Sequence, residues 1–388
     1  MKKSFAKKVL AVTLALMMVF MFAACGNEEA PSGDAQVLKI GGIGPVTGGA
    51  AVYGNAVKNG AEIAVEEINA LGGDVQVEFR FEDDTHDAEV AVNAYNKLKD
   101  WGMQVLMGTT TTTPCIAVAA EAFGDRMFEL TPSASSNQVT EGKDNVFQMC
   151  FTDPNQGTTA ADYILDNNLG TKIAAIVNLS DAYSTGIYNA FVAELQAKGT
   201  DVVYKGEYPD DTNTNFEVQL KAAQAAGADL VFLPIYYTPA SLIMNQAKTM
   251  GYAPTFFGVD GMDGILTLEG FDTSLADGVM LMTPFNPWSE DEAVATFVSK
   301  YEEKYGETPN QFAADAYDCI YAIYNAFLAA GCSVSDDAAT ICEAMVPYFT
   351  SEFTMDGLTG KSMTWGTNGE VAKAPNVCVI QDAIYVDR

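Results

Sequence analysis

From Gln36 onward, the sequence alternates short apolar runs with stretches of helical periodicity. Residues 37–44 form an apolar run that ends in glycines, and Ala51–Leu71 repeats apolar residues at helical spacing. The alternation continues to about residue 131 and restarts after Thr152. Such alternation is typical of parallel strands joined by crossover helices. We therefore expect an α/β protein with two consecutive doubly wound parallel sheets, at residues 36–152 and 153–282.

The rest of the chain has a different pattern. Helical periodicity dominates from Asp291 to Thr350, and residues 353–388 indicate turns and short strands. An open parallel sheet binds its ligands at the carboxyl ends of its strands. Two such sheets facing each other would enclose a cleft between those ends.

The first 24 residues indicate an export signal. Four lysines precede an uncharged run, Val9–Ala24, that is short for a membrane span of ~20 residues. The run ends in Ala23, Ala24 and Cys25, which resembles the lipobox of a bacterial lipoprotein. This resemblance implies cleavage before Cys25, a diacylglyceryl group on its sulfur and a flexible tether at 25–35. An ordinary secretory signal with an incidental cysteine is the alternative.

Charge and motif content argue against several function classes. The net charge of −30 disfavours binding to nucleic acid. The sequence lacks GxSxG, and no His/Cys grouping has zinc spacing, so we predict neither an enzyme nor a metal or cofactor site. After Cys25, Cys115, Cys150 and Cys319 are expected in the core, and Cys332 and Cys342 are the candidate disulfide pair.

The loops that follow the predicted strands share one chemical character. They are rich in hydroxyls, glycines and tyrosines and contain neither Arg nor Lys. The only histidine, His86, lies outside these loops, and we do not expect it in the site. The loops are GPVTGGAAVYGN, GTTTTTP, TPSASSN, NLSDAYSTG, LPIYYTPAS and GVDGMDG.

In order and spacing, five of these loops (all except LPIYYTPAS), together with FEDDTHDAEVAV, resemble the leucine/isoleucine/valine-binding type of extracellular solute-binding protein of ABC importers. The resemblance extends from Val37 to the end of the chain. It implies two α/β lobes that close over one ligand and are joined by crossings near Thr152, Thr283 and Phe353. The N-terminal lobe would then comprise 36–152 and 284–352, and the C-terminal lobe 153–283 and 353–388.

The threonine run is the candidate grip for a ligand carboxylate. Thr111 and Thr112 lie between a predicted strand end and a helix N-terminus, where free backbone N–H groups favour an anion. The family resemblance adds the Ser135 hydroxyl and the Ala134 N–H. Five identical residues leave the register of the run open, and hydroxyls at such positions also cap helices.

The resemblance also implies an acidic acceptor for an ammonium group. It places this role on Asp260, with Asp263 as the rival. Aromatic side chains would form apolar walls around the ligand side chain. The candidates are Tyr53, Tyr183, Tyr236 (or Tyr237, if the strand ends one residue later) and Phe312.

Together these features predict a monomeric, lipid-anchored receptor on the outer face of the cell membrane. It would bind an amino acid, with a branched aliphatic one favoured, and deliver it to the permease of an ABC transporter. The same fold with an amide, urea or an aromatic acid as ligand is the alternative, as is a sensor that presents its ligand to a signalling receptor.

Overall fold

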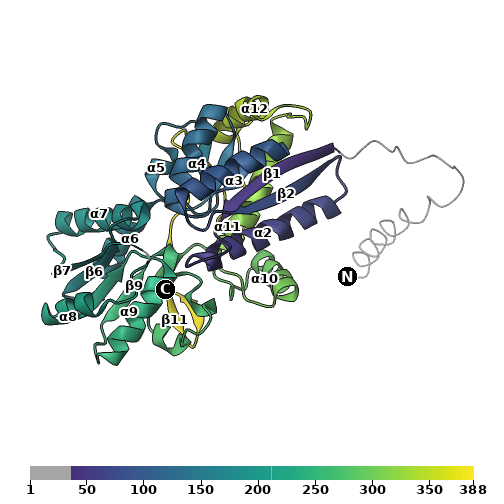
Figure 1. Ribbon diagram of the computed structural model, residues 1–388. Coiled ribbons are helices and arrows are strands. Elements are labelled where there is room, and N and C mark those ends of the chain that lie inside the picture. The colour runs from purple at the N-terminus through teal and green to yellow at the C-terminus, as the bar shows by residue number, and fades with distance from the viewer. Residues whose placement is uncertain (1–35, 211) are drawn as a thin grey trace, which may run out of the picture. The chain divides into compact units, whose positions relative to one another are not determined.

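The computed structural model describes residues 36–210 and 212–388 (Figure 1). The predicted export signal, the tether and Cys25 lie outside these residues. Among the described residues, no helix combines the length and apolar character that a membrane span requires.

The first sheet has five parallel strands in the order β2-β1-β3-β4-β5. Its direction of winding reverses between β1 and β3, and the helices between its strands are the predicted crossovers. The strands are β1 (Gln36–Gly44), β2 (Val75–Asp83), β3 (Val105–Gly108), β4 (Glu129–Thr131) and β5 (Val146–Gln148), and the helices are α2 (Ala51–Ala70), α3 (Ala88–Trp101), α4 (Thr112–Asp125) and α5 (Asn137–Thr140).

The second sheet has seven strands in the order β12-β11-β10-β9-β8-β6-β7. Strands β6–β10 run parallel to one another, whereas β11 pairs antiparallel with both β10 and β12. Strands β11 and β12 come from the predicted short strands of the tail. This sheet is therefore mixed at one edge. Its strands are β6 (Ile173–Asn178), β7 (Tyr204–Tyr208), β8 (Leu230–Leu233), β9 (Thr255–Gly258), β10 (Met280–Thr283), β11 (Asn376–Gln381) and β12 (Ile384–Asp387).

Helices α6 (Asp153–Asp166), α7 (Ala182–Ala197), α8 (Glu217–Ala225) and α9 (Tyr237–Thr249) accompany this sheet, together with the short 3-10 turns η1 (Asp260–Met262), η2 (Ile265–Thr267) and η3 (Thr273–Ala276). We call these helices and turns with β6–β12 the C-lobe. Strands β6 and β8 are buried along their whole length, as expected for parallel strands of a sheet that is covered on both faces.

Three later helices pack on the first sheet. They are α10 (Glu292–Tyr305), α11 (Gln311–Ala329) and α12 (Ala338–Ser351). Helix α11 approaches α2 so closely that a Cβ on Gly60 would lie 2.0 Å from Ala313 O. On α12, Phe349 packs edge-on against Phe128 of the segment before β4. We call these helices together with β1–β5 and α2–α5 the N-lobe.

The third crossing between the lobes comes later than predicted. After α12, Phe353 stacks on Phe349, and Trp365 Nε1 donates to Gln148 O at 2.8 Å. Lys373 still donates to Met149 O at 3.0 Å, and only Asn376 enters the second sheet. The predicted crossing near Phe353 is therefore wrong, because buried aromatic contacts hold this segment on the N-lobe.

The predicted disulfide is also wrong. All six cysteines of the described residues are free. Cys342 is buried on the inner face of α12, whereas Cys332 is half-exposed in the turn after α11, with its sulfur 4.0 Å from Ile341 O. The predicted burial of Cys115, Cys150 and Cys319 is confirmed.

Candidate functional site

Several of the candidate residues follow the strands at which each sheet reverses its order. In the N-lobe the loops after β1 and β3 lead into α2 and α4, and in the C-lobe the loops after β6 and β8 lead into α7 and α9. Crevices form at such reversal points, because neighbouring loops diverge there. The fold therefore accounts for why Tyr53, Thr111, Tyr183 and Tyr236 lie at corresponding positions of the two lobes.

Four of the five threonines, Thr109–Thr112, are buried, and most hydroxyls of the run bond to the protein itself. Thr110 Oγ1 donates to Ile43 O at 3.2 Å, and Thr109 Oγ1 donates to Thr111 O at 3.2 Å. Thr112 is the first residue of α4 and is 1% exposed. Thr111 is the N-cap of α4, but its side chain accepts no hydrogen bond from the first turn. This helix start is therefore not closed by its own cap.

The serine-rich loop lies against the threonine run. Thr131 Oγ1 donates to Thr109 O and Ser133 Oγ donates to Thr110 O, both at 2.6 Å. The Ala134 N–H already donates to Thr131 Oγ1 at 3.0 Å, so this group is used within the protein. Ser135 Oγ is fully buried and makes no hydrogen bond of ordinary geometry among the described residues, but it lies close enough to the buried Asp153 carboxyl to oppose the rise in that group's pKa caused by burial. Buried hydroxyls are rarely left in this state.

Asp260 starts η1, at the end of β9, and is 3% exposed. The Tyr183 hydroxyl donates to its Oδ1 at 2.6 Å. Burial raises the pKa of Asp260 to about 7, although the Tyr183 hydrogen bond opposes the shift. A buried carboxylate in this state gains from a nearby cation, since a positive charge would restore its ordinary ionisation.

Asp263, the rival acceptor, is more completely bonded by the protein. Its carboxylate accepts from the Tyr385 hydroxyl at 2.6 Å, the Gln311 N–H at 2.9 Å and the Gly264 N–H at 2.8 Å. Burial raises its pKa to about 6. These donors join the η1 loop to α11 and β12, which favours a structural role for Asp263 and leaves Asp260 as the better acceptor.

Aromatic rings bring the two lobes together. The Tyr53 ring centroid lies 4.4 Å from that of Phe312 and 5.3 Å from that of Tyr236, and Tyr236 stacks on Tyr183 at 4.9 Å. The Tyr53 hydroxyl donates to Gly261 O and accepts from the Tyr237 N–H, both in the C-lobe. Tyr237 packs edge-on against Tyr53 at 4.8 Å, so both tyrosines of the uncertain pair belong to this cluster.

Contrary to expectation, the structure places His86 against two of the candidate residues, Thr111 and Tyr236. His86 Nδ1 lies 2.9 Å from Thr111 Oγ1, and its ring packs edge-on against Tyr236 with centroids 5.7 Å apart. The loop of His86 follows β2, which pairs with β1. Strand-end position also points to the loop of His86, but the family resemblance implies a structural use for this segment, and for that reason the residue was missed.

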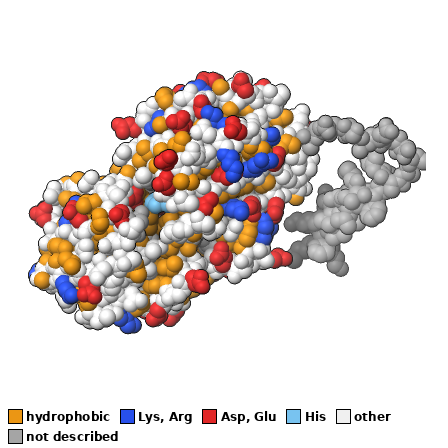
Figure 2. All heavy atoms as spheres, in the orientation of Figure 1, with side chains coloured by type: hydrophobic (Ala, Val, Ile, Leu, Met, Phe, Trp, Pro, Cys, Tyr) orange, Lys and Arg blue, Asp and Glu red, His pale blue; other side chains and the backbone are white. Residues whose placement is uncertain are grey.

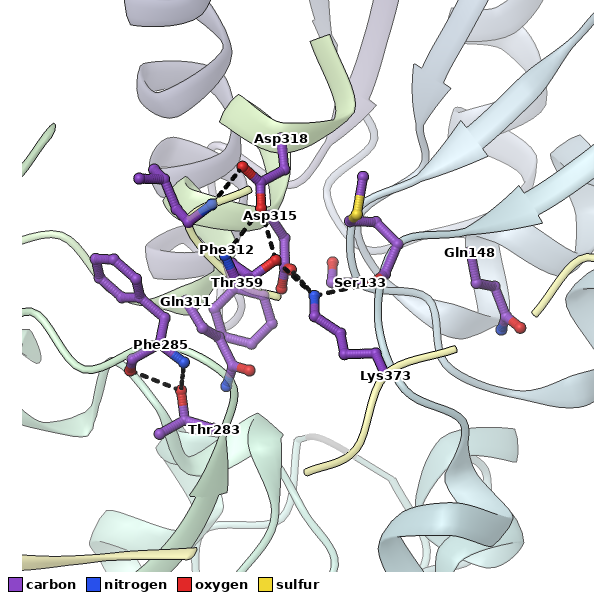
Figure 3. A network of polar contacts seen from close by, with 12 residues as sticks. Ser133, Gln148, Thr283, Phe285, Gln311, Phe312, Asp315, Asp318, Thr359 and Lys373 are labelled. Carbon is purple, nitrogen blue, oxygen red and sulfur yellow. Dashed lines mark hydrogen bonds and ion pairs between the residues drawn. The ribbon is translucent and has the colours of Figure 1, made fainter. Parts of the chain in front are cut away.

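Two glutamines around Asp260 were also missed. Gln156 Oε1 accepts the Asp260 N–H at 3.1 Å, and Gln311 Nε2 donates to Asp260 O at 2.9 Å. Figure 3 shows Gln311 next to Phe312 at the start of α11. These bonds fix the backbone of Asp260 from α6 and α11, and no sequence pattern distinguishes them from ordinary surface glutamines. In the described part of the chain, no group of three or more His, Cys, Asp or Glu side chains is arranged to hold a metal.

Comparison with known proteins agrees with this architecture. Residues 37–380 match the model of the periplasmic binding protein family. A Leu/Ile/Val-binding protein homolog from Brucella melitensis is 32% identical over 256 residues, which is 65% of this chain and 68% of the relative. A leucine binding protein from Thermotoga maritima superposes with a TM-score of 0.81 at 26% identity, over 90% of this chain and 97% of that one.

A branched-chain amino acid transporter substrate binding protein from Streptococcus pneumoniae, solved with isoleucine, has the same TM-score of 0.81 at 24% identity, over 91% of this chain and 100% of that one. The predicted fold of two α/β lobes is thus confirmed as that of a type I periplasmic binding protein. The chain belongs to the periplasmic binding protein family, whose members are solute-binding receptors rather than a class of enzymes.

Proposed function

We propose that this protein captures an amino acid between its lobes and delivers it to the permease of an ABC transporter. The observation that carries the proposal is the placement of a buried acidic acceptor, Asp260, in one lobe and an uncapped helix start with a buried hydroxyl, Ser135, in the other. A zwitterion requires these two kinds of group, one for each of its charges.

The carboxylate of the amino acid would be held at the N-lobe. The N–H groups of Thr112 and Thr113 open α4, and the partial positive charge of a helix start favours an anion there. The Ser135 hydroxyl would add a donor. A hydrogen bond to a charged partner contributes ~1.5–3 kcal/mol, so several can replace an arginine.

The ammonium group would bind Asp260, and the rings of Tyr53, Tyr183, Tyr236 and Phe312 would surround the side chain. An aliphatic side chain suits such walls, because they offer apolar area with few unpaired polar groups. Leucine, isoleucine and valine are therefore the favoured ligands. The printed names of the relatives and the isoleucine complex of the streptococcal neighbour support this class.

The cellular setting follows from the same proposal. Cys25 would carry the lipid anchor, so that a monomer is held at the outer face of the cell membrane by the tether at 25–35. The solute-binding role of the relatives supports a permease as the protein partner. The acidic surface, with red side chains spread over the face in Figure 2, is compatible with an exported protein that does not bind nucleic acid.

A ligand screen tests the function. The melting temperature of the protein without residues 1–24 is measured with each of the twenty amino acids, and with urea, acetamide and benzoate. A ligand at a thousand times its Kd stabilises the folded state by ~4 kcal/mol, so leucine, isoleucine or valine should produce a clear shift. A shift with benzoate or urea alone would replace the amino acid by the alternative ligand class.

Calorimetry on one variant then tests the ammonium acceptor. Asp260→Asn keeps the shape of the side chain but removes the charge, and it should abolish measurable binding of leucine. Asp201→Asn, at an exposed position of the C-lobe, is the matched control and should bind leucine as the parent does. Unchanged leucine affinity in Asp260→Asn would contradict the assignment.

A further inference from the structure

We propose that His86 is a positioning residue for the carboxylate end of the site. It holds the Thr111 hydroxyl away from the first turn of α4, so that the helix start stays open to the ligand. The inference rests on the amino-acid binding proposed above and adds a residue that determines how tightly the carboxylate is held.

The N-cap of α4 lacks the capping bond that aspartate N-caps of the protein make, as does Thr152, the N-cap threonine of α6. Asp87, Asp181 and Asp291 each accept hydrogen bonds from the first turn of the helix that they cap. Thr111 has the extended backbone of such a cap, with φ −105° and ψ 150°, yet its side chain makes no capping bond. Its hydroxyl lies instead 2.9 Å from His86 Nδ1. The imidazole therefore competes with the helix for this hydroxyl.

His86 is itself fixed from both lobes. Its backbone is left-handed, with φ 62°, and its backbone N–H donates to Asp84 Oδ1 at 2.9 Å. On its other side the ring meets the edge of Tyr236, the N-cap of α9 in the C-lobe. The imidazole thus occupies a defined position between Thr111 and the aromatic cluster, where its orientation sets that of the hydroxyl.

The role of the contact between His86 Nδ1 and Thr111 Oγ1 depends on which of the two atoms donates the hydrogen. A threonine hydroxyl has one hydrogen to donate and can also accept. If His86 Nδ1 carries a hydrogen and donates it to Thr111 Oγ1, the Thr111 hydrogen is free for the ligand carboxylate. If Nδ1 accepts instead, the hydroxyl hydrogen is used and Thr111 offers the ligand only an acceptor. Our proposal therefore places a hydrogen on Nδ1 when the ligand is bound.

Two substitutions isolate this contact without disturbing the backbone. Glycine and asparagine both tolerate the left-handed conformation of residue 86. His86→Gly removes the imidazole and should weaken leucine binding about tenfold, the equivalent of one hydrogen bond to a charged group. His86→Asn keeps an amide donor close to the position of Nδ1 and should restore most of the affinity. Equal affinities for the parent and His86→Gly would overturn the proposal.

A double-mutant cycle separates positioning from a general structural effect. Thr111→Val removes the hydroxyl, so adding His86→Gly to this variant should weaken leucine binding no further. Additive losses would show that His86 acts through something other than Thr111 and would overturn the inference. If the parent itself does not bind leucine, the proposed function fails first, and this outcome is distinct from a binding parent with an indifferent His86.

The single histidine also permits a direct readout. The chain contains one imidazole, so a long-range ¹H–¹⁵N correlation spectrum of the protein without an affinity tag shows only His86. With leucine bound, the spectrum should report a protonated Nδ1. An unprotonated Nδ1 in the complex would overturn the assignment of the hydrogen, whatever the affinities of the variants.

Discussion

Lys373 Nζ lies 2.7 Å from Asp315 Oδ1, and the two side chains are 3% and 2% exposed. The same ammonium donates to Met149 O at 3.0 Å and to Thr359 Oγ1 at 2.6 Å (Figure 3). Met149 directly follows the last strand of the first sheet, and Lys373 shortly precedes β11 of the second. The ion pair therefore holds two connecting segments, one after β5 and one before β11, against α11.

Removing this cation should destabilise the protein strongly. Lys373→Met leaves Asp315 buried without its counter-charge, and breaking a buried pair in this way costs ~3–5 kcal/mol. Burial already raises the pKa of Asp315 to about 6 against the effect of Lys373, so the isolated carboxyl should bind a proton near neutral pH. Urea unfolding measures the loss. Lys361→Met, at an exposed lysine, is the control and should change stability by under ~1 kcal/mol. Similar losses of unfolding free energy in both variants would contradict the role of the pair.

Glu129 should make stability fall as the pH rises. It is fully buried on β4, and burial raises its pKa to about 8, above the ordinary 4.5. The folded state therefore keeps a proton on Glu129 that the unfolded chain releases. The contribution of this protonated side chain to the free energy of unfolding is complete below pH 4.5 and is lost as the pH rises through 8.

Glu129→Gln removes this titration and can still accept from Cys115 Sγ, which lies 3.3 Å from Glu129 Oε1. Relative to the parent, the variant should gain stability between pH 5 and 9, on the order of a few kcal/mol. Unfolding curves at several pH values check this. Glu121→Gln, at an exposed position of α4, should leave the pH dependence unchanged. A parallel pH dependence in Glu129→Gln and the parent would disprove the prediction.

The sequence predicts the fold well, because each lobe repeats a local rule. Apolar strands, helical periodicity and glycine-rich strand ends are local signals, and together with the family resemblance they point to Tyr53, Tyr183 and Tyr236, which meet at the starts of α2, α7 and α9. The segment from Phe353 to Lys373 was misplaced because its attachment depends on distant partners. Trp365 bonds to Gln148 and Lys373 to Asp315, and no pattern within the tail records either contact.

The site shows the same division between local and distant information. Strand-end position selects Thr111 and the family resemblance selects Asp260, but whether a hydroxyl is free depends on its neighbours in space. Ala134 N–H is taken by Thr131, Ser135 Oγ makes no hydrogen bond of ordinary geometry among the described residues, and Thr111 Oγ1 meets His86. These assignments follow from side-chain packing, which the order of residues along the chain does not express.

A glycine on α2 should be required for the packing of the N-lobe helices. A Cβ on Gly60 would lie 2.0 Å from Ala313 O, a backbone atom of α11 that cannot move aside cheaply. Gly60→Ala should therefore destabilise the protein by ~1–3 kcal/mol, as overpacking does. In Gly124→Ala on α4 the added methyl meets nothing within 4 Å, and the substitution should stabilise by ~0.5–1 kcal/mol. Thermal unfolding of both variants checks the opposite signs, and a neutral Gly60→Ala would contradict the close approach.

The Tyr53 hydroxyl should stabilise the closed arrangement of the lobes rather than the N-lobe itself. It donates to Gly261 O and accepts from the Tyr237 N–H, so its partners all lie across the cleft. Tyr53→Phe keeps the ring contacts with Phe312 and Tyr236 but leaves these two backbone groups unpaired on closure. We expect leucine affinity to fall about tenfold, while the melting temperature of the ligand-free protein changes little.

Tyr95→Phe provides the contrast, because Tyr95 donates to Asp125 Oδ2 at 3.1 Å entirely within the N-lobe. Its loss should lower the melting temperature by a few degrees, the effect of ~1 kcal/mol in a protein of this size, and leave leucine affinity unchanged. Calorimetric titration and thermal unfolding of both variants separate the two roles. If Tyr53→Phe lowers the melting temperature as Tyr95→Phe does and binds leucine like the parent, the hydroxyl supports the fold and does not act in closure.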